Sequence, residues 1–142
     1  MNKLTIIRGL PGSGKTTLAK QLKGDDLSIY HTEIENFFRD PRGKFDSSNS
    51  MKPFMIRKAM RGCFWEAMSY LETGFNVIVS NNFIRLRDMK SYLDNARRLR
   101  AQIEIIDLPL EPVLNKERKS QHDISFDTIL KMASRWQPYP KS

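Results

Sequence analysis

Short apolar stretches alternate with longer amphipathic segments along this chain, and turn-forming residues separate them. Four of the short stretches are rich in β-branched and aliphatic residues, which is typical of buried strands: residues 3–8, 27–31, 75–80 and 102–107. The segments with helical spacing of apolar residues lie between and after them: residues 16–22, 50–73, 87–100, 111–119 and 125–136. Because strands alternate with helices, the pattern predicts an α/β fold, one domain over 1–142, with a four-stranded parallel sheet and helices on both faces.

Cap and breaker residues mark where the predicted helices begin and end. Ser50 is expected to cap the long helix, Pro53 is tolerated in its first turn, and Thr73 and Gly74 end it. Ser125 is expected to cap the last helix. The chain shows no internal repeat, low-complexity tract or linker, which agrees with a single domain.

The composition is that of a globular protein, and it argues against a membrane-spanning or secreted protein. The chain has 142 residues, of which 39% are hydrophobic and 28% charged. No apolar run approaches the ~20 residues that span a bilayer, and the first residues do not resemble a secretory signal. The single cysteine, Cys63, excludes an internal disulfide framework and a cysteine-based zinc site. We therefore expect a cytoplasmic protein with no membrane or disulfide-linked partner.

Basic residues outnumber acidic residues and gather in two runs. The net charge is +8. Residues 39–61 contain seven basic and two acidic residues, and residues 85–100 contain six basic and two acidic residues. A single run of this kind is read more readily as a solvated helix face. With two such runs in so small a domain, nucleic-acid binding and solvated helix faces are equally good interpretations.

The clearest chemical motif lies between the first predicted strand and the first predicted helix. Residues 9–16, Gly-Leu-Pro-Gly-Ser-Gly-Lys-Thr, match the phosphate-loop pattern G-x-x-x-x-G-K-[ST]. Glycines let the backbone turn its N–H groups toward a phosphate, Lys15 reaches the β- and γ-phosphates, and the Thr16 hydroxyl ligates Mg²⁺. An ordinary glycine-rich turn is the alternative. The residues expected to contact the nucleotide are Gly12, Ser13, Gly14, Lys15, Thr16 and Thr17.

Elimination narrows the class of phosphate-loop protein. A GTPase needs an Asn-Lys-x-Asp guanine reader, and residues 115–118 lack its aspartate. A motor or AAA-type ATPase usually has acidic residues at the end of an apolar strand. Here the third predicted strand runs into Ser-Asn-Asn at 80–82, and the fourth ends in a lone Asp107. The pattern therefore favours a small kinase.

Two acidic residues follow the second predicted strand, where the site of a parallel sheet lies. A carboxylate there can accept the proton of an attacking hydroxyl and orient it in line with the γ-phosphate. Either Glu33 or Glu35 could instead cap the next short helix. We assign the role of general base to Glu35 and expect Glu33 to cap the next short helix. We also place Glu33 on the acceptor side of the site. The choice of base between the two stays open.

Basic residues near the C-terminus predict a lid over the nucleotide, covering about residues 114–124. Phosphoryl transfer needs cations around the charge that develops on the transferred group. Arg118 is the predicted transition-state arginine, with a solvated helix end as the alternative. His122 is expected to be structural or to lie at the edge of the nucleotide.

The acceptor side is expected to include an insert at about residues 33–52. Arg39, Asn81 and Asn82 lie at predicted strand ends and could hold a substrate phosphate or an acceptor oxygen. A turn-forming role is an equal alternative for Asn81.

Four segments in this order resemble the polynucleotide-kinase-like branch of P-loop kinases, which takes in phage-type small DNA kinases and zeta- and AAA_33-like ATP-binding kinases. They are residues 8–17, Glu-Asn-Phe-Phe at 35–38, Val-Ile-Val-Ser-Asn-Asn-Phe at 77–83, and His-Asp-Ile at 122–124. The resemblance implies a four-stranded kinase core with a C-terminal helical lid, ATP and Mg²⁺ as cofactors, and transfer of the γ-phosphate to a hydroxyl on nucleic acid. For a phage-encoded chain it also implies the cytoplasm of a bacterial host.

Lys15 and Thr16 carry over directly from the resemblance, and two positions depart from it. Glu35 stands where the family has its catalytic aspartate. Phe38 stands where the family has an arginine, with Arg39 next to it as a stand-in. Some phage relatives phosphorylate the hydroxymethyl group of 5-hydroxymethyluracil within DNA, so this acceptor side is expected to be specialised.

The expected function is an ATP-dependent kinase that acts on DNA, at a 5′-hydroxyl end or at a hydroxymethylated base. The two basic runs would follow the phosphate backbone, so that affinity falls steeply with salt. A small-molecule kinase for a nucleoside, sugar or antibiotic would use the same core. A non-catalytic protein that binds ATP is a further alternative.

Overall fold

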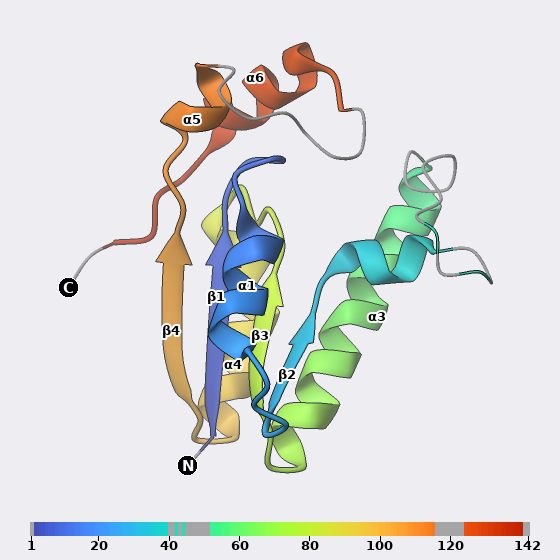
Figure 1. Cartoon of the computed structure of the whole chain (residues 1–142), viewed down its shortest axis with the longest axis vertical. Coiled ribbons are helices and arrows are strands. Elements are labelled where there is room, and N and C mark those ends of the chain that lie inside the picture. Colours follow the sequence, from blue (N-terminus) through green and yellow to red (C-terminus); the bar gives the residue numbers. More distant parts are fainter. Residues whose placement is uncertain (1, 40–41, 43, 45–51, 116–123, 141–142) are drawn as a thin grey trace.

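Four parallel strands form one sheet at the centre of the protein (Figure 1). The computed structural model describes residues 2–39, 42, 44, 52–115 and 124–140. The strands are β1 (Lys3–Arg8), β2 (Ile29–Thr32), β3 (Asn76–Ser80) and β4 (Gln102–Asp107), in the spatial order β2-β3-β1-β4. Each lies within two residues of the predicted stretch. The predicted α/β fold with a four-stranded parallel sheet is confirmed.

Helices pack on both faces of this sheet. The α-helices are α1 (Lys15–Lys23), α3 (Pro53–Glu72), α4 (Lys90–Arg98), α5 (Glu111–Leu114) and α6 (Phe126–Arg135). Two 3₁₀ helices, η1 (Ile34–Phe38) and η2 (Leu86–Met89), precede α3 and α4 respectively. In Figure 1, α1 lies in front of the sheet and α4 behind it. No helix in these described ranges is both long enough and apolar enough to cross a membrane.

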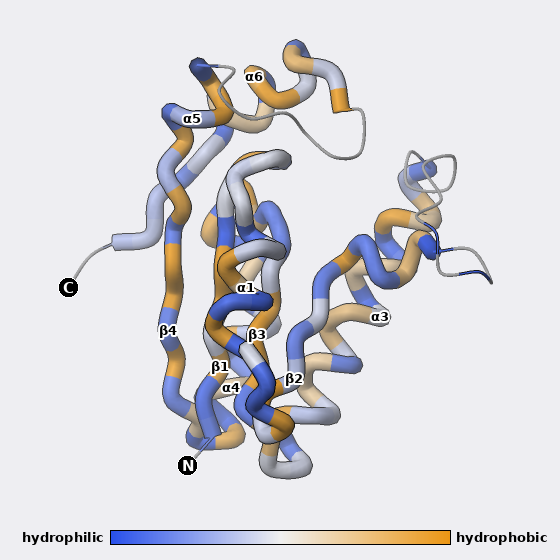
Figure 2. Tube along the Cα trace, viewed as in Figure 1, coloured by the Kyte–Doolittle hydropathy of each residue, from blue (hydrophilic) through white to orange (hydrophobic). Residues whose placement is uncertain are grey.

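Alternating side chains of β1 divide the core between the two faces. Leu4 and Ile6 pack with residues of α3 and α4, whereas Ile7 packs with Ala19 of α1. β3 divides in the same way, because side chains of a strand point alternately to opposite faces. Figure 2 shows hydrophobic and hydrophilic residues alternating along β4, whose residues are exposed or half-buried.

A third apolar cluster attaches the C-terminal helices to the phosphate loop. Leu10 of the loop is fully buried against Val113 of α5 and Ile129 of α6. Ser125 caps α6 as predicted, since its hydroxyl accepts a hydrogen bond from the Thr128 N–H at 3.2 Å. The two helices therefore lie above the carboxyl ends of the strands (Figure 1).

Some helix boundaries differ from the predicted ones. The helix predicted over 87–100 is divided into η2 and α4, because the Asp88 carboxylate accepts a hydrogen bond from the Arg85 N–H at 3.0 Å and closes a separate turn. Helix α3 ends at Thr73 and Gly74 as predicted but begins at Pro53. Ser50, its predicted cap, lies outside the described residues. So does the second half of the predicted 111–119 helix, beyond Asn115.

Candidate active site

The phosphate loop joins β1 to α1 in a tight turn. Gly12 and Gly14 have φ angles of 82° and 96°, in the left-handed region that favours glycine. Within the turn, the Ser13 N–H donates to the Leu10 carbonyl at 3.1 Å. The two positive φ angles agree with the sequence argument that glycine allows this backbone to fold closely around a phosphate.

Lys15 begins α1 and is buried, with 9% of its surface exposed. Its ammonium donates to the Leu10 carbonyl at 2.9 Å and to the Gly9 carbonyl at 3.3 Å. Burial lowers the pKa of Lys15 to about 8, and the negative charges of Glu35 and then Glu33 oppose that shift. An ammonium held by neutral carbonyls can exchange them for phosphate oxygens, which compensate its charge better.

Thr16 and Glu33 meet beside the lysine. The Thr16 hydroxyl donates to the Glu33 carboxylate, at 3.0 Å to Oε2 and 3.2 Å to Oε1. Glu33 occupies the N-cap position of η1, as expected, but its side chain makes no cap hydrogen bond there. Its carboxylate instead accepts the hydrogen bond from Thr16, the predicted magnesium ligand. This contact joins the turn after β2 to α1, so local sequence alone does not predict it.

His31 lies behind Glu33 on the same side of β2, two residues earlier. Its Nε2 is 3.4 Å from Glu33 Oε1 and 2.7 Å from the Ser80 hydroxyl at the end of β3. Burial lowers the pKa of His31 and raises the pKa of Glu33, whose pKa the Glu35 charge raises further. Sequence analysis missed His31. Its spacing of two from Glu33 along a strand was the available signal.

Glu35 lies in the first turn of η1 and is half-buried. Of the two carboxylates, it exerts the larger electrostatic effect on Lys15. The turn that carries it is fixed at two points. The Ile34 N–H donates to Asn81 Oδ1 at 2.8 Å, and the Phe37 ring packs so closely on α3 that a Cβ on Gly62 would lie 2.7 Å from it.

Asn81 therefore binds the backbone of η1. The sequence had suggested either a substrate contact or a turn-forming role for this residue, and neither included this bond. Its Oδ1 accepts the bond from Ile34, and its Nδ2 donates to the Cys63 sulfur at 3.5 Å. The amide is thus engaged within the protein. Positioning the turn that carries Glu35 is the role that its contacts support.

The other predicted site residues are spread around this centre. The Asn82 carbonyl accepts a hydrogen bond from the Gly9 N–H at 3.3 Å, so its backbone supports the phosphate loop. Thr17 is exposed in the first turn of α1, and Arg39 is exposed where η1 ends. Arg118 and His122 lie outside the described residues. Of the predicted lid, the structure describes residues 114, 115 and 124.

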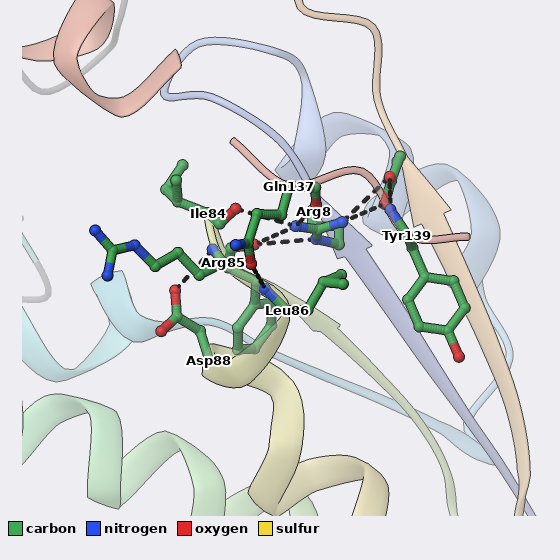
Figure 3. A network of polar contacts seen from close by, with 9 residues as sticks. Arg8, Ile84, Arg85, Leu86, Asp88, Gln137 and Tyr139 are labelled. Atoms are coloured by element: carbon green, nitrogen blue, oxygen red, sulfur yellow. Dashed lines mark hydrogen bonds and ion pairs between the residues drawn. The ribbon is translucent and has the colours of Figure 1, made fainter. Parts of the chain in front are cut away.

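The end of β4 carries an acid that is already paired. Asp107 receives Arg8 Nη1 at 3.0 and 3.2 Å and the Tyr139 N–H at 2.8 Å (Figure 3). The end of β3 carries Ser80, which contacts His31. Of the acids at the strand ends, the one that contacts the phosphate loop is therefore Glu33, directly after β2, and not Asp107.

The donor set at Thr16 suits a hard cation. A hydroxyl and a carboxylate lie together at the N-terminus of α1, and oxygen ligands of this kind are those Mg²⁺ takes alongside substrate phosphates. Within the described ranges there is no group of three or more His, Cys, Asp or Glu side chains that could hold a metal. The hydroxyl and carboxylate oxygens of Thr16 and Glu33 therefore fit a magnesium ion bound together with a nucleotide.

Solved structures with the same fold include several kinases. A chain of the Pnkp1/Rnl/Hen1 RNA repair complex matches with a TM-score of 0.75 and 21% identity over 94% of this chain and 43% of that chain. A sugar kinase from Janibacter sp. HTCC2649 matches with a TM-score of 0.66 and 14% identity over 99% and 80%. The Mycobacterium tuberculosis APS kinase CysC, in complex with AMPPNP and APS, matches with a TM-score of 0.59 and 17% identity, over 83% of this chain and 69% of that chain.

These identities show a shared fold, and the present chain spans less than half the length of the RNA repair chain. A family model gives the stronger assignment. The model named AAA_33, described as an AAA domain, matches residues 4–127, most of the chain. The chain therefore belongs to the AAA_33 family, and it has the fold of the P-loop kinases.

Proposed function

We propose that the protein is an ATP-dependent kinase that transfers the γ-phosphate to a hydroxyl group on nucleic acid, with DNA as the favoured acceptor. The observation that carries the proposal is the meeting of two carboxylates with the phosphate loop. Glu33 accepts the Thr16 hydroxyl, and Glu35 acts electrostatically on Lys15. A metal-side carboxylate and a second, more accessible one are the parts that hydroxyl activation requires.

The loop side of the site binds the nucleotide. Backbone N–H groups of residues 12–16 and the α1 N-terminus favour the phosphates, and Lys15 moves from loop carbonyls to phosphate oxygens. Thr16 and Glu33 would hold Mg²⁺, which supplies charge neutralisation at the β- and γ-phosphates when bound. Arg118 and His122 of the predicted lid complete the proposed nucleotide contacts.

Glu35 is the proposed general base on the acceptor side. Its carboxylate takes the proton of the acceptor hydroxyl as that oxygen bonds to the γ-phosphorus, while the bond from the γ-phosphorus to the leaving ADP oxygen breaks. The position of η1, fixed by Asn81 and by the packing of Phe37, supports this role, because Glu35 lies near enough to act electrostatically on Lys15 and Glu33. Arg39, exposed beyond η1, is the proposed contact for an acceptor phosphate.

Charge supports a polyanionic acceptor. The net charge is +8, and the run at 39–61 extends from the acceptor side into α3. The fold match to a chain of an RNA repair complex points the same way. The proposed acceptor hydroxyl is a 5′ end or the hydroxymethyl group of a base such as 5-hydroxymethyluracil.

Single-turnover transfer from labelled ATP to 5′-hydroxyl DNA tests the chemistry in Glu35→Gln, with Glu33→Gln as the matched variant. We expect Glu35→Gln to slow transfer by about 100-fold or more, because the base contributes at that scale, and to leave ATP affinity near that of the wild type. Glu33→Gln should weaken binding of magnesium-ATP. Full transfer by Glu35→Gln would show that it is not the base.

A small-molecule kinase is the second candidate, because the sugar kinase match covers 99% of this chain and 80% of that chain. Offering free nucleosides and sugars beside DNA distinguishes the two. Turnover on a free metabolite with none on DNA would replace the nucleic-acid proposal.

A further inference from the structure

The two basic runs of the sequence differ once the chain is folded. On α4, Lys90 pairs with Asp94 at 2.6 Å, Arg97 lies 3.7 Å from the same carboxylate, and Arg98 donates to the Asn95 side chain at 3.2 Å. One carboxylate, Asp94, thus pairs with two of the three cations of this helix, and a neutral amide holds the third. These contacts within the helix favour a solvated helix face for this run.

Helix α3 carries cations of another kind. Arg57, Lys58 and Arg61 are exposed on one side of its first three turns, and residues 52–65 include no acidic residue. Within the described part of the chain, no carboxylate lies within ion-pair distance of these three side chains. The next acid along the helix, Glu66, accepts a hydrogen bond from the Tyr30 hydroxyl at 2.8 Å.

Two large aromatic side chains lie on the same helix, one before these cations and one after them. Phe54 is 62% exposed and Trp65 is 63% exposed. With Arg57, Lys58 and Arg61 they form what we call the α3 stripe. At 1.5 Å per residue the aromatics are roughly 16 Å apart along the helix. In Figure 2, α3 alternates between hydrophilic and hydrophobic bands.

We infer that the α3 stripe binds a single-stranded stretch of the acceptor nucleic acid, an inference that rests on the proposed function. Arg57, Lys58 and Arg61 would contact phosphates, and Phe54 and Trp65 would stack on unpaired bases. Exposed aromatic rings on either side of the cations fit a strand whose base faces are open. A duplex shows a protein only its base edges and backbone. A second copy of the chain would bring three cations against three cations.

The helix that carries the stripe packs on the turn that carries the proposed base. Gly62, next to Arg61 in the sequence, is the residue on which Phe37 of η1 packs. In Figure 1, η1 follows β2 and crosses the N-terminal half of α3, at the end of the sheet where the phosphate loop lies. A strand bound along the stripe is thereby led toward Glu35.

Binding of a labelled oligothymidylate of about 12 nucleotides to the full chain, without ATP, tests this inference. We compare Arg57→Gln/Lys58→Gln/Arg61→Gln with the matched α4 variant Lys90→Gln/Arg97→Gln/Arg98→Gln, which loses the same charge. The α3 variant should weaken binding by about tenfold or more and reduce the salt slope by about 2, since each single-strand phosphate contact contributes about 0.7. The α4 variant should change both far less.

Phe54→Ala/Trp65→Ala tests the stacking part. It should weaken binding by about tenfold or more while leaving the salt slope unchanged, because stacking does not release counterions. Trp65→Phe should retain most of the affinity and lose the fluorescence quenching that a stacked base causes. Circular dichroism and ATP binding check that each variant is folded.

The inference is overturned if the α3 variants bind the oligonucleotide as the wild type does, or if a blunt duplex of equal length binds as tightly as the single strand. It is also overturned if Trp65→Ala changes the oligomeric state and leaves binding unaltered. Phosphoryl transfer is measured separately. Transfer to DNA with normal KM in the α3 variants would reject the stripe alone, whereas transfer to metabolites only would reject the proposed function.

Discussion

Two buried cations flank the phosphate loop, and they are held in opposite ways. Arg8, at the end of β1, is fully buried, and all three of its guanidinium nitrogens donate hydrogen bonds. Its partners are the Asp107 carboxylate and the carbonyls of Phe83, Ile84 and Gln137, and its guanidinium lies 4.1 Å from the centre of the Trp136 ring. Lys15, at the start of α1, has two carbonyl partners.

This difference in hydrogen-bond partners indicates that Arg8 carries a structural charge and Lys15 a functional one. Asp107 balances the charge of Arg8, and the bonds to Gln137 and Phe83 attach the C-terminal segment and the turn after β3 to the sheet (Figure 3). Phe83 has a φ of 45°, which is rare for a bulky residue, and its carbonyl is turned to Arg8. Lys15 has no carboxylate within hydrogen-bond distance among the described residues, so its charge is available for a phosphate.

Removing the functional charge gives the largest expected effect. Lys15→Met should reduce phosphoryl transfer by about a thousandfold or more, because the loop then loses its cation at the transferred group. The free energy of unfolding should stay unchanged or rise, since burial disfavours this ammonium. Transfer kinetics and urea denaturation of the same preparation measure both. A strongly destabilised Lys15→Met would remove the contrast with Arg8.

Removing the structural charge should act on stability. Arg8→Met leaves Asp107 and several carbonyls without their donor, and loss of one partner of a buried pair lowers the free energy of unfolding by about 3–5 kcal/mol. Denaturant titration measures the loss. The double variant Arg8→Met/Asp107→Asn should recover part of it, because no unpaired carboxylate remains. If Arg8→Met were as stable as the wild type, the network would not hold the C-terminal segment.

The pH dependence of ATP binding gives the smallest effect and sharpens the assignment of Lys15. Its folded pKa is lowered from 10.5 to about 8, so the ammonium is charged below that pH and becomes neutral above it. ATP affinity should therefore fall by up to about tenfold per pH unit above 8. Stability should rise between about 8 and 10.5, where the unfolded chain binds more protons than the folded one.

Lys15→Arg is the control for this titration, because arginine stays charged throughout the range. Its ATP affinity should be lower than that of the wild type, for reasons of geometry, and independent of pH. A wild-type affinity that is equally flat up to pH 9.5 would contradict the lowered pKa.

The sequence was enough to predict the sheet, the phosphate loop and the acidic turn after β2, because each depends on local spacing. Contacts between elements were not predictable in this way. Glu33 occupies a cap position, but its carboxylate accepts a hydrogen bond from Thr16, and this contact depends on how β2 and α1 pack. The Arg8 network joins residues 8, 83, 107 and 137, which only the folded topology brings together.

Transfer of label from γ-labelled ATP to two DNA acceptors is the measurement that tests directly whether the protein is a DNA kinase. One acceptor is a DNA with free 5′-hydroxyls, and the other has blocked ends and internal 5-hydroxymethyluracil, with Lys15→Met as the blank in both reactions. We expect label on one of the two acceptors and none in the blank, and the labelled acceptor identifies the hydroxyl. Binding of ATP without label on either DNA would contradict a DNA kinase.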